Sequence, residues 1–204
     1  MILTIIGSGN VGGALAQRLI AAGHTVLIGA RSPLSAKSIT LAGHIGEDRF
    51  TTVESALAQS EAVILTIPPD AVLHLIPALQ TASHNVVIDA TNAVRVRPEP
   101  YPTAFHAVKD AGIADVVKCF NTTGFENMMN PVYPGGALDM FMAGDSSKAK
   151  AVAHTLALDC GFGDCWDFGG GDKVELLEKF ALAWINLAIM QGHGRDIGFR
   201  VKRR

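Results

Sequence analysis

The sequence predicts an α/β fold with a doubly wound, mostly parallel sheet and a helical tail at the carboxyl end. Apolar runs of four to six residues recur along the chain and are separated by segments of helical periodicity. This alternation is typical of a parallel sheet that is covered by helices. The first apolar run leads directly into a glycine-rich turn, which opens a helical segment. The chain has 204 residues, of which 49% are hydrophobic, so it can bury a core of this kind.

The elements follow in chain order from these runs and from the residues that cap helices. Strands are predicted at residues 3–6, 25–29, 49–52, 63–67, 86–90, 116–120, 140–143 and 165–168. Helices are predicted at residues 11–22, 35–42, 53–59, 71–79, 103–112, 147–159 and 173–191. Many of the helical segments begin after a Ser, Thr, Asn or Asp, whose side chains cap the amino ends of helices.

The last predicted helix is apolar nearly all round between Phe180 and Met190. One amphipathic stripe does not account for this pattern, so the helix needs cover on more than one side. It is either a core helix or the interface of a homodimer. A membrane span is excluded because the apolar stretch is interrupted by Glu178, Lys179 and Asn186 and is shorter than the ~20 residues that a bilayer requires.

Composition excludes several classes of function. Lys and Arg number 17 against 19 for Asp and Glu, and this balance gives no strong field for nucleic acid or an anionic membrane. The amino end has no export signal, and the three cysteines, Cys119, Cys160 and Cys165, form no CxxC motif. The seven histidines show no metal-ligand spacing. We therefore expect a cytoplasmic protein with reduced thiols, no metal, no nucleic-acid partner and no membrane span.

A GxGxxG motif lies between the first predicted strand and the first predicted helix. Its residues are Gly7, Ser8, Gly9, Asn10, Val11 and Gly12. In this context Gly7 permits a tight turn, Gly9 lets the backbone approach a pyrophosphate, and Gly12 lets the helix pack close to the strand. The amino end of the helix then faces the anion. The motif predicts a Rossmann NAD(P)-binding fold, with an ordinary glycine-rich turn as the alternative.

The residues after the second predicted strand indicate which dinucleotide is bound. An NAD site would place an Asp or Glu about twenty residues after the glycines, but no acidic residue occurs before Glu47. Arg31 can instead bind a 2′-phosphate through two hydrogen bonds, while Ser32 can add a hydroxyl and Lys37 a charge. The sequence thus predicts NADP(H), unless Arg31 is only a solvated loop residue.

Two further strand ends should line the dinucleotide, because open α/β sheets bind ligands at the carboxyl ends of their strands. Thr66, Ile67 and Pro68 end the fourth strand, and Asn92 follows the fifth. Pro68 would bend the chain away from the sheet next to the pyrophosphate, and Asn92 offers an amide near the nicotinamide. Asp89 is expected to cap the next turn. We assign no catalytic acid, base or nucleophile.

These motifs make the chain resemble the coenzyme F-420-dependent NADP oxidoreductase family almost from end to end. The resemblance rests on the segments GSGNVG (7–12), GHTVLIGAR (23–31), VILTIP (63–68), VKCFNTTG (117–124) and GHGRDIGF (192–199). It implies phosphate contacts at Arg31, Ser32 and Lys37. It also implies direct hydride transfer between the nicotinamide and a stacked deazaflavin (coenzyme F-420) or flavin ring, without a protein acid or base. Residues 120–125 and 164–171 differ from well-studied members, so the acceptor stays open.

From these observations we expect an NADP-binding Rossmann domain at 1–168, and a helix and tail at 169–204 that close the active site. The leading function is an NADP(H)-dependent oxidoreductase with a small-molecule redox partner. The alternatives are an imine or carbonyl reductase, resembling pyrroline-5-carboxylate reductase or the β-hydroxyacid dehydrogenases, and a non-catalytic NADP(H) redox sensor. Trp166, Phe168 and Trp184 either stack on an acceptor ring or belong to the core. His193 either approaches the substrate or lies in a hydrogen-bonded turn.

Overall fold

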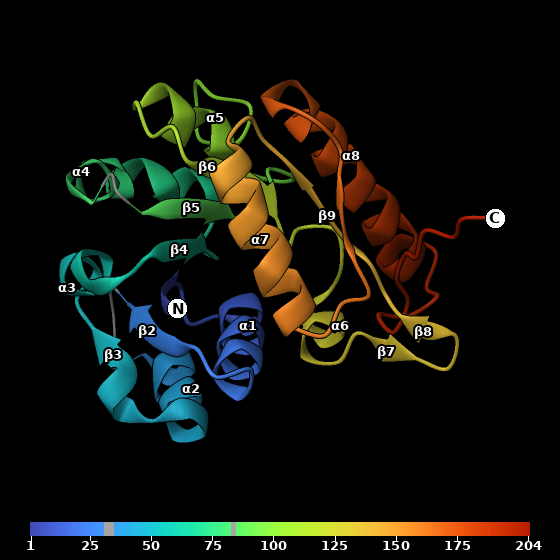
Figure 1. Ribbon diagram of the computed structural model, residues 1–204, viewed down its shortest axis with the longest axis horizontal. Coiled ribbons are helices and arrows are strands. Elements are labelled where there is room, and N and C mark those ends of the chain that lie inside the picture. Colours follow the sequence, from blue (N-terminus) through green and yellow to red (C-terminus); the bar gives the residue numbers. More distant parts are fainter. Residues whose placement is uncertain (31–34, 83–84) are drawn as a thin grey trace.

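A computed structural model describes residues 1–30, 35–82 and 85–204. Within these residues one sheet has the strand order β10-β9-β6-β5-β4-β1-β2-β3, and helices cover both of its faces (Figure 1). The six strands β1 to β6 are parallel, β9 pairs antiparallel with β6, and β10 is parallel to β9. The strand order reverses at β1 and β4, which is where ligands bind in folds of this type. The predicted doubly wound, mostly parallel sheet is confirmed.

Every predicted strand of the sheet is present close to its expected position. The strands are β1 (Ile2–Ile6), β2 (Thr25–Gly29), β3 (Phe50–Thr51), β4 (Ala62–Leu65), β5 (Val86–Asp89), β6 (Val116–Cys119), β9 (Met140–Ala143) and β10 (Cys165–Asp167). Two short strands, β7 (Val132–Tyr133) and β8 (Gly136–Ala137), pair as a separate hairpin. Sequence analysis missed this hairpin because strands of two residues show no alternation of apolar and polar side chains.

The helices also follow the prediction, with three differences: a short helix at 125–129 was not predicted, one predicted helix is broken, and the last one ends in a π-helical turn. They are α1 (Asn10–Ala21), α2 (Ala36–Ile45), α3 (Val53–Gln59), α4 (Ile76–Thr81), α5 (Ala104–Asp110), α6 (Phe125–Met129), α7 (Ser147–Asp159) and α8 (Val174–Ile185). The helix expected at 71–79 is a 3₁₀ segment, η2 (Pro69–Leu75), followed by α4. Pro77 explains the break, because a proline inside a helix removes a hydrogen bond and clashes with the preceding turn. The last helix continues beyond Ile185 as a π-helical turn, η4 (Asn186–Met190).

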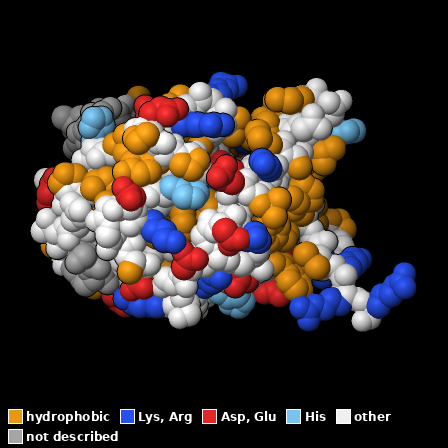
Figure 2. Space-filling model, turned by 90° about the horizontal axis from the view of Figure 1, so that it is seen from above, with side chains coloured by type: hydrophobic (Ala, Val, Ile, Leu, Met, Phe, Trp, Pro, Cys, Tyr) orange, Lys and Arg blue, Asp and Glu red, His pale blue; other side chains and the backbone are white. Residues whose placement is uncertain are grey.

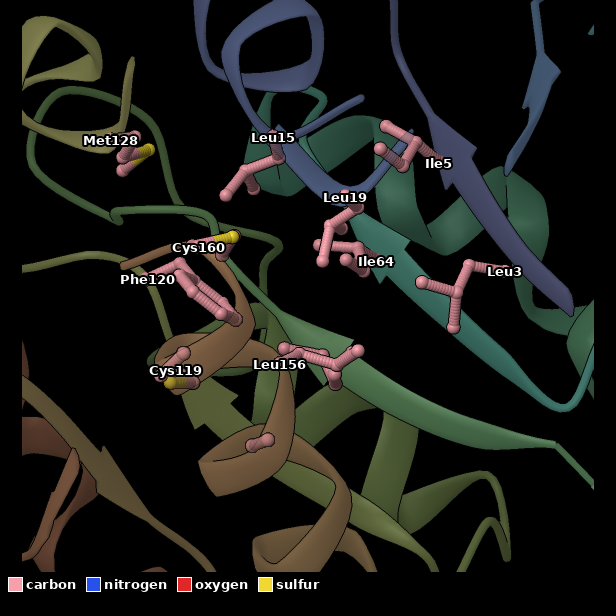
Figure 3. Close-up of a cluster of buried hydrophobic side chains, with 14 of the residues drawn as sticks. Leu3, Ile5, Leu15, Leu19, Ile64, Cys119, Phe120, Met128, Leu156 and Cys160 are labelled. Carbon is pink, nitrogen blue, oxygen red and sulfur yellow. The ribbon is translucent and has the colours of Figure 1, made fainter. Parts of the chain in front are cut away.

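Alternating residues of the central strands fill a core on each side of the sheet. Leu3 and Ile5 of β1 and Ile64 of β4 face Leu15 and Leu19 of α1 and Leu156 of α7 (Figure 3). On the opposite face, the second core contains Ile6, Val63, Leu65, Val87, Phe105 and Leu177. The sheet is therefore buried on both faces, and only the ends of its strands can carry a site.

Helix α8 contributes to this second core and also leaves an apolar surface uncovered. Val174 and Leu177 are fully buried, whereas Leu176 and Leu182 of α8 and Ile189 and Met190 of η4 are 52%, 40%, 54% and 69% exposed. Figure 2 shows hydrophobic side chains gathered on the α8 side of the molecule. In the part of the chain that the structure describes, no helix is long and apolar enough to cross a membrane.

The residues after η4 fold back against α8 and the segment that leads into β9. The Asp139 amide donates to the Phe199 carbonyl at 3.0 Å, and the Phe199 ring stacks on Phe180 with 4.5 Å between ring centroids. The side chain of Asn127 in α6 donates to the Ile197 carbonyl at 2.7 Å. These contacts hold the tail against α6, α8 and the start of β9.

Candidate functional site

The glycine-rich turn between β1 and α1 is shaped by close packing at two of its three glycines. Gly7 has a φ of +118°, and a Cβ there would lie 2.8 Å from Thr66 Oγ1. At Gly12 a Cβ would lie 2.0 Å from the carbonyl oxygen of Gly7. At Gly9 a Cβ would meet no atom within 4 Å. Gly7 and Gly12 are thus required by the fold, while the space in front of Gly9 is open to a ligand.

The amino end of α1 is available to an anion. Gly9 occupies the N-cap position, no described side chain caps the helix, and its first turn contains no acidic residue. In that turn, Asn10 is exposed, and the partly buried Val11 packs against the core. Unpaired amide groups and the helix dipole favour negative charge at such an end. The geometry fits the pyrophosphate of a dinucleotide.

A cleft of about 680 Å³ extends from this turn along the carboxyl ends of β1, β2 and β4. It is lined by Ile6, Gly7, Ser8, Gly29, Ala30, Ser35, Ser38, Val53, Ile67, Pro68, Ala71, His74 and Leu75. Ser8 Oγ lies 2.8 Å from Ser38 Oγ, which lies 2.9 Å from Ser35 Oγ. Sequence analysis missed Ser35 and Ser38 as lining residues, although two serines at the start of a helix beside the second strand were a visible signal.

The residues proposed to select NADP(H) occupy different places. Arg31 and Ser32 directly follow Ala30 of the cleft but lie outside the described residues. Lys37 lines a neighbouring cavity of about 370 Å³ between α1, α2 and α6, together with Asn10 and Phe125. The described residues therefore bring Ser8, Ile67 and Pro68 together in one cleft and place Lys37 beside it.

Thr66 supports the turn from behind. Its hydroxyl lies 3.0 Å from the carbonyl oxygen of Ile6 and 3.1 Å from that of Gly7, and it can donate to either. A residue that satisfies these carbonyl groups fixes the position of the turn. Thr66 thus holds the glycine-rich segment, whereas the neighbouring Ile67 and Pro68 face the cleft.

A second cavity, of about 300 Å³, lies where the nicotinamide was expected. It is lined by Pro68, Pro69, Asn92, Val94, Arg95, Val96, Ile185 and Ile189. Pro68 also lines the first cleft, so the two spaces are neighbours. Asn92 Nδ2 donates to the Asn121 carbonyl at 2.9 Å, and Asn121 Nδ2 donates to Asn92 Oδ1 at 3.0 Å. This pair fixes the Asn92 amide at the carboxyl ends of β5 and β6.

A buried charge cluster adjoins the chain segment that carries Asn92. Lys118 of β6 is fully buried, and its Nζ lies 2.6 Å from Glu178 Oε1 of α8 and 3.1 Å from Asp89 Oδ2 of β5. It also donates to the Thr91 carbonyl at 2.5 Å. The other Asp89 oxygen, Oδ1, accepts from the Thr91 amide at 2.9 Å, which confirms the capping role predicted for Asp89. Lysine in the otherwise apolar strand VVKC was a signal of a buried partner.

The aromatic side chains near the tail are engaged in packing. Trp184 Nε1 donates to the Ile197 carbonyl at 2.7 Å, and the Arg195 guanidinium lies 5.3 Å from the Trp184 ring. Trp166 Nε1 donates to Asp139 Oδ2 at 2.9 Å. Phe168 meets the Phe141 ring edge-on. These contacts support the core interpretation of all three aromatic residues.

The titratable groups near the strand ends offer little for proton transfer or nucleophilic attack. Burial raises the pKa of Cys160 from 9.0 to about 12 and the pKa of Cys119 well above its ordinary value, so both remain thiols at neutral pH. His193 is exposed, and its amide donates to the Leu187 carbonyl at 3.3 Å. Among the described residues that line the second cavity, Arg95 alone is ionisable. The arrangement suits binding and alignment of ligands.

Comparison with known proteins agrees with this geometry. Residues 2–93 match the family described as NADP oxidoreductase, coenzyme F420-dependent. The F420-dependent NADP reductase of Methanothermobacter thermautotrophicus is 27% identical over 221 residues, which cover 98% of this chain and 94% of that protein. A crystal structure from Arthrobacter sp. FB24, of a protein proposed to be an F420-dependent NADP-reductase, has a TM-score of 0.81 at 23% identity and covers both chains completely. An imine reductase from Bacillus cereus has a TM-score of 0.64 at 20% identity, over 94% of this chain and 62% of its own.

Proposed function

We propose, from the confirmed resemblance to the coenzyme F420-dependent NADP oxidoreductase family, that the chain is an NADP(H)-dependent oxidoreductase with a flavin-like electron acceptor. The observation that carries the proposal is the open space before Gly9 at the uncapped amino end of α1. A pyrophosphate fits both features, because it is anionic and needs close approach to backbone amides.

The residues present fit the rest of the dinucleotide. The cleft along β1, β2 and β4 has room for the adenosine half, with Ser8 and Ala30 on its walls. Arg31 and Ser32 follow Ala30 in the sequence and supply the groups that a 2′-phosphate requires. Lys37 lies beside the cleft, so we assign it a smaller share of this contact.

The nicotinamide half would occupy the second cavity, between Pro68 and Asn92. When bound, the nicotinamide exchanges a hydride, which is equivalent to two electrons and one proton, with an acceptor ring such as coenzyme F420 or a flavin. The chain holds the reacting partners in contact: Val94, Val96, Ile185 and Ile189 give the cavity apolar walls against which a nicotinamide ring can pack. Because hydride transfer depends on alignment, no protein acid or base is needed.

The fold likeness to imine reductases favours one second candidate, a reductase of imines or carbonyl compounds. More than a third of the imine reductase has no counterpart in this chain, since the match covers 62% of that protein. A substrate of this kind also needs a proton donor, and the described lining of the second cavity offers Arg95 alone. These two facts make the flavin-like acceptor the better supported candidate.

An assay of NADPH oxidation with separate acceptors tests the proposal. We expect turnover with coenzyme F420 or FMN and none with a cyclic imine. Turnover with the imine alone would establish the second candidate. Tight NADPH binding without oxidation by any acceptor would indicate a redox sensor.

Nucleotide selectivity tests the cofactor separately from the acceptor. We expect NADPH to bind at least about tenfold more tightly than NADH, because a two-point contact from Arg31 to the phosphate should contribute about 1.4 kcal/mol or more. Arg31→Ala should remove most of this preference and leave NADH affinity nearly unchanged, with Lys37→Ala as a matched control that has a smaller effect. Calorimetric titration measures the affinities of the wild type and both variants for the two nucleotides, and equal wild-type affinities would refute the phosphate assignment.

A further inference from the structure

The charge cluster formed by Lys118, Asp89 and Glu178 joins three elements that are far apart in the sequence. Lys118 comes from β6, Asp89 from the end of β5 and Glu178 from α8. The side chains of Lys118 and Asp89 are fully buried, and that of Glu178 is 11% exposed. Removing such groups from water costs several kcal/mol per ion. A cluster of this kind is weak evidence for stability, so its contacts need another explanation.

The cluster forms hydrogen bonds with the backbone of the chain segment that carries Asn92. The carbonyl group of Thr91 accepts a hydrogen bond from Lys118 Nζ, and the amide of Ala93 donates to Glu178 Oε2 at 2.8 Å. Asn92 lies between these two residues and lines the second cavity. The cluster therefore holds the main chain on both sides of Asn92, which lines the proposed nicotinamide position.

The cluster also carries an unbalanced charge. Two carboxylates face one ammonium group, so with all three groups ionised one net negative charge lies next to the backbone that flanks Asn92. The nearby charged side chains Arg95, Arg97, Glu175 and Lys179 are all exposed. Water and salt screen exposed charges far more than buried ones. The cluster thus adds a weakly screened negative charge to the field at the second cavity, which Arg95 on the cavity wall opposes from an exposed position.

We propose that this cluster is a positioning and electrostatic element that favours oxidised over reduced nicotinamide, an inference that rests on the proposed NADP(H) function. NADP⁺ carries a positive ring and NADPH a neutral one, so a buried negative charge stabilises the oxidised form selectively. One unit charge at a separation on the order of 10 Å and an effective dielectric constant of about 20 changes the affinity ratio by roughly tenfold. Tenfold in that ratio corresponds to about 30 mV in the potential of the bound two-electron couple.

Two substitutions that remove one negative charge from opposite sides of Lys118 test this role. Glu178→Gln and Asp89→Asn keep the size of each side chain, and Glu175→Gln removes an exposed charge from the same helix as the matched control. The measurement is the dissociation constant of NADP⁺ divided by that of NADPH, from calorimetry on each protein. We expect this ratio to rise about tenfold in both cluster variants and less than about twofold in Glu175→Gln.

The outcomes separate this inference from the proposed function. If the wild-type protein bound neither nucleotide, the function itself would fail. If both nucleotides bound and the cluster variants weakened them equally, the function would stand and the electrostatic role would be overturned. If both cluster variants failed to fold while Glu175→Gln folded, the cluster would be purely structural, and the inference would again fail. A variant that folds decides the question alone if its counterpart does not.

Discussion

Two glycines of the same motif should respond in opposite ways to an added side chain. At Gly9 the backbone has φ −76° and ψ −172°, which valine adopts readily, and a Cβ there meets no atom within 4 Å. At Gly12 a Cβ would lie 2.0 Å from the backbone oxygen of Gly7, and backbone atoms cannot move aside cheaply. Gly9→Val should therefore spare the fold and obstruct the ligand, whereas Gly12→Ala should damage the fold itself.

The expected magnitudes differ enough to measure. Overpacking costs about 1–3 kcal/mol, and a clash with backbone reaches at least the upper end of that range. A cost of about 3 kcal/mol should lower the Tm of Gly12→Ala by roughly 6–12 °C, at about 2–4 °C per kcal/mol for a chain of this size. Gly9→Val should shift Tm by less than about 2 °C. It should weaken NADPH and NADH equally, by about ten- to a hundredfold, which is the loss of one charge-assisted hydrogen bond worth about 1.5–3 kcal/mol.

Differential scanning calorimetry and nucleotide titration of the two variants make the comparison. The pyrophosphate assignment fails if Gly9→Val retains wild-type NADPH affinity. A Gly9→Val protein that unfolded as readily as Gly12→Ala would contradict the open space seen at Gly9. An effect on NADPH alone would locate Gly9 near the 2′-phosphate, away from the pyrophosphate that both nucleotides share.

Three further predictions concern other parts of the chain. Alanine at Asn92 or Asn121 should lower turnover about ten- to a few hundredfold, as expected for a mispositioned ring; a loss beyond about ten-thousandfold in Asp89→Ala with intact NADPH affinity would instead reveal a general acid. The pKa of Cys160 is about 12 in the folded protein against an ordinary 9.0, so unfolding should become easier as the pH rises from about 9 to about 12, and less steeply in Cys160→Ala. We also predict a homodimer through the exposed side chains of α8 and η4: sedimentation should show that Ile189→Lys yields monomers and that Val132→Lys, at an equally exposed apolar residue of the hairpin, does not.

The strands of the sheet could be predicted from the sequence because they are apolar runs, which a parallel sheet buries on both faces. The limits of β2 and β9 match the structure fully, as do those of α3 and α7. Short elements escaped prediction: α6 has five residues, and each strand of the β7–β8 hairpin has two. The break in the helix at Pro77 could have been predicted, because proline is tolerated in the first turn of a helix but not in its interior. The antiparallel direction of β9 could not have been predicted in this way. The connection from β6 to β9 contains only the short α6 and the β7–β8 hairpin, and not the long crossover helix that joins parallel strands.

In the candidate site too, the residues that could be predicted belong to local sequence patterns, and those that could not depend on contacts between distant residues. Gly7, Gly9 and Gly12 lie within six positions, so their pattern alone predicted a turn that binds an anion. Pro68 and Asn92 were predicted to line the site because each follows a recognisable strand. The Lys118 cluster depends on a contact between residues 118 and 178, and no local pattern specifies that pairing. A lysine between valines and a cysteine shows only that its charge needs partners. Its partners decide whether the lysine charge only anchors α8 or also acts on the nicotinamide that we propose binds beside Asn92. The second carboxylate sets the net charge of the cluster. A single carboxylate would neutralise Lys118, whereas Asp89 and Glu178 together leave one negative charge, which would stabilise the positive ring of bound NADP⁺.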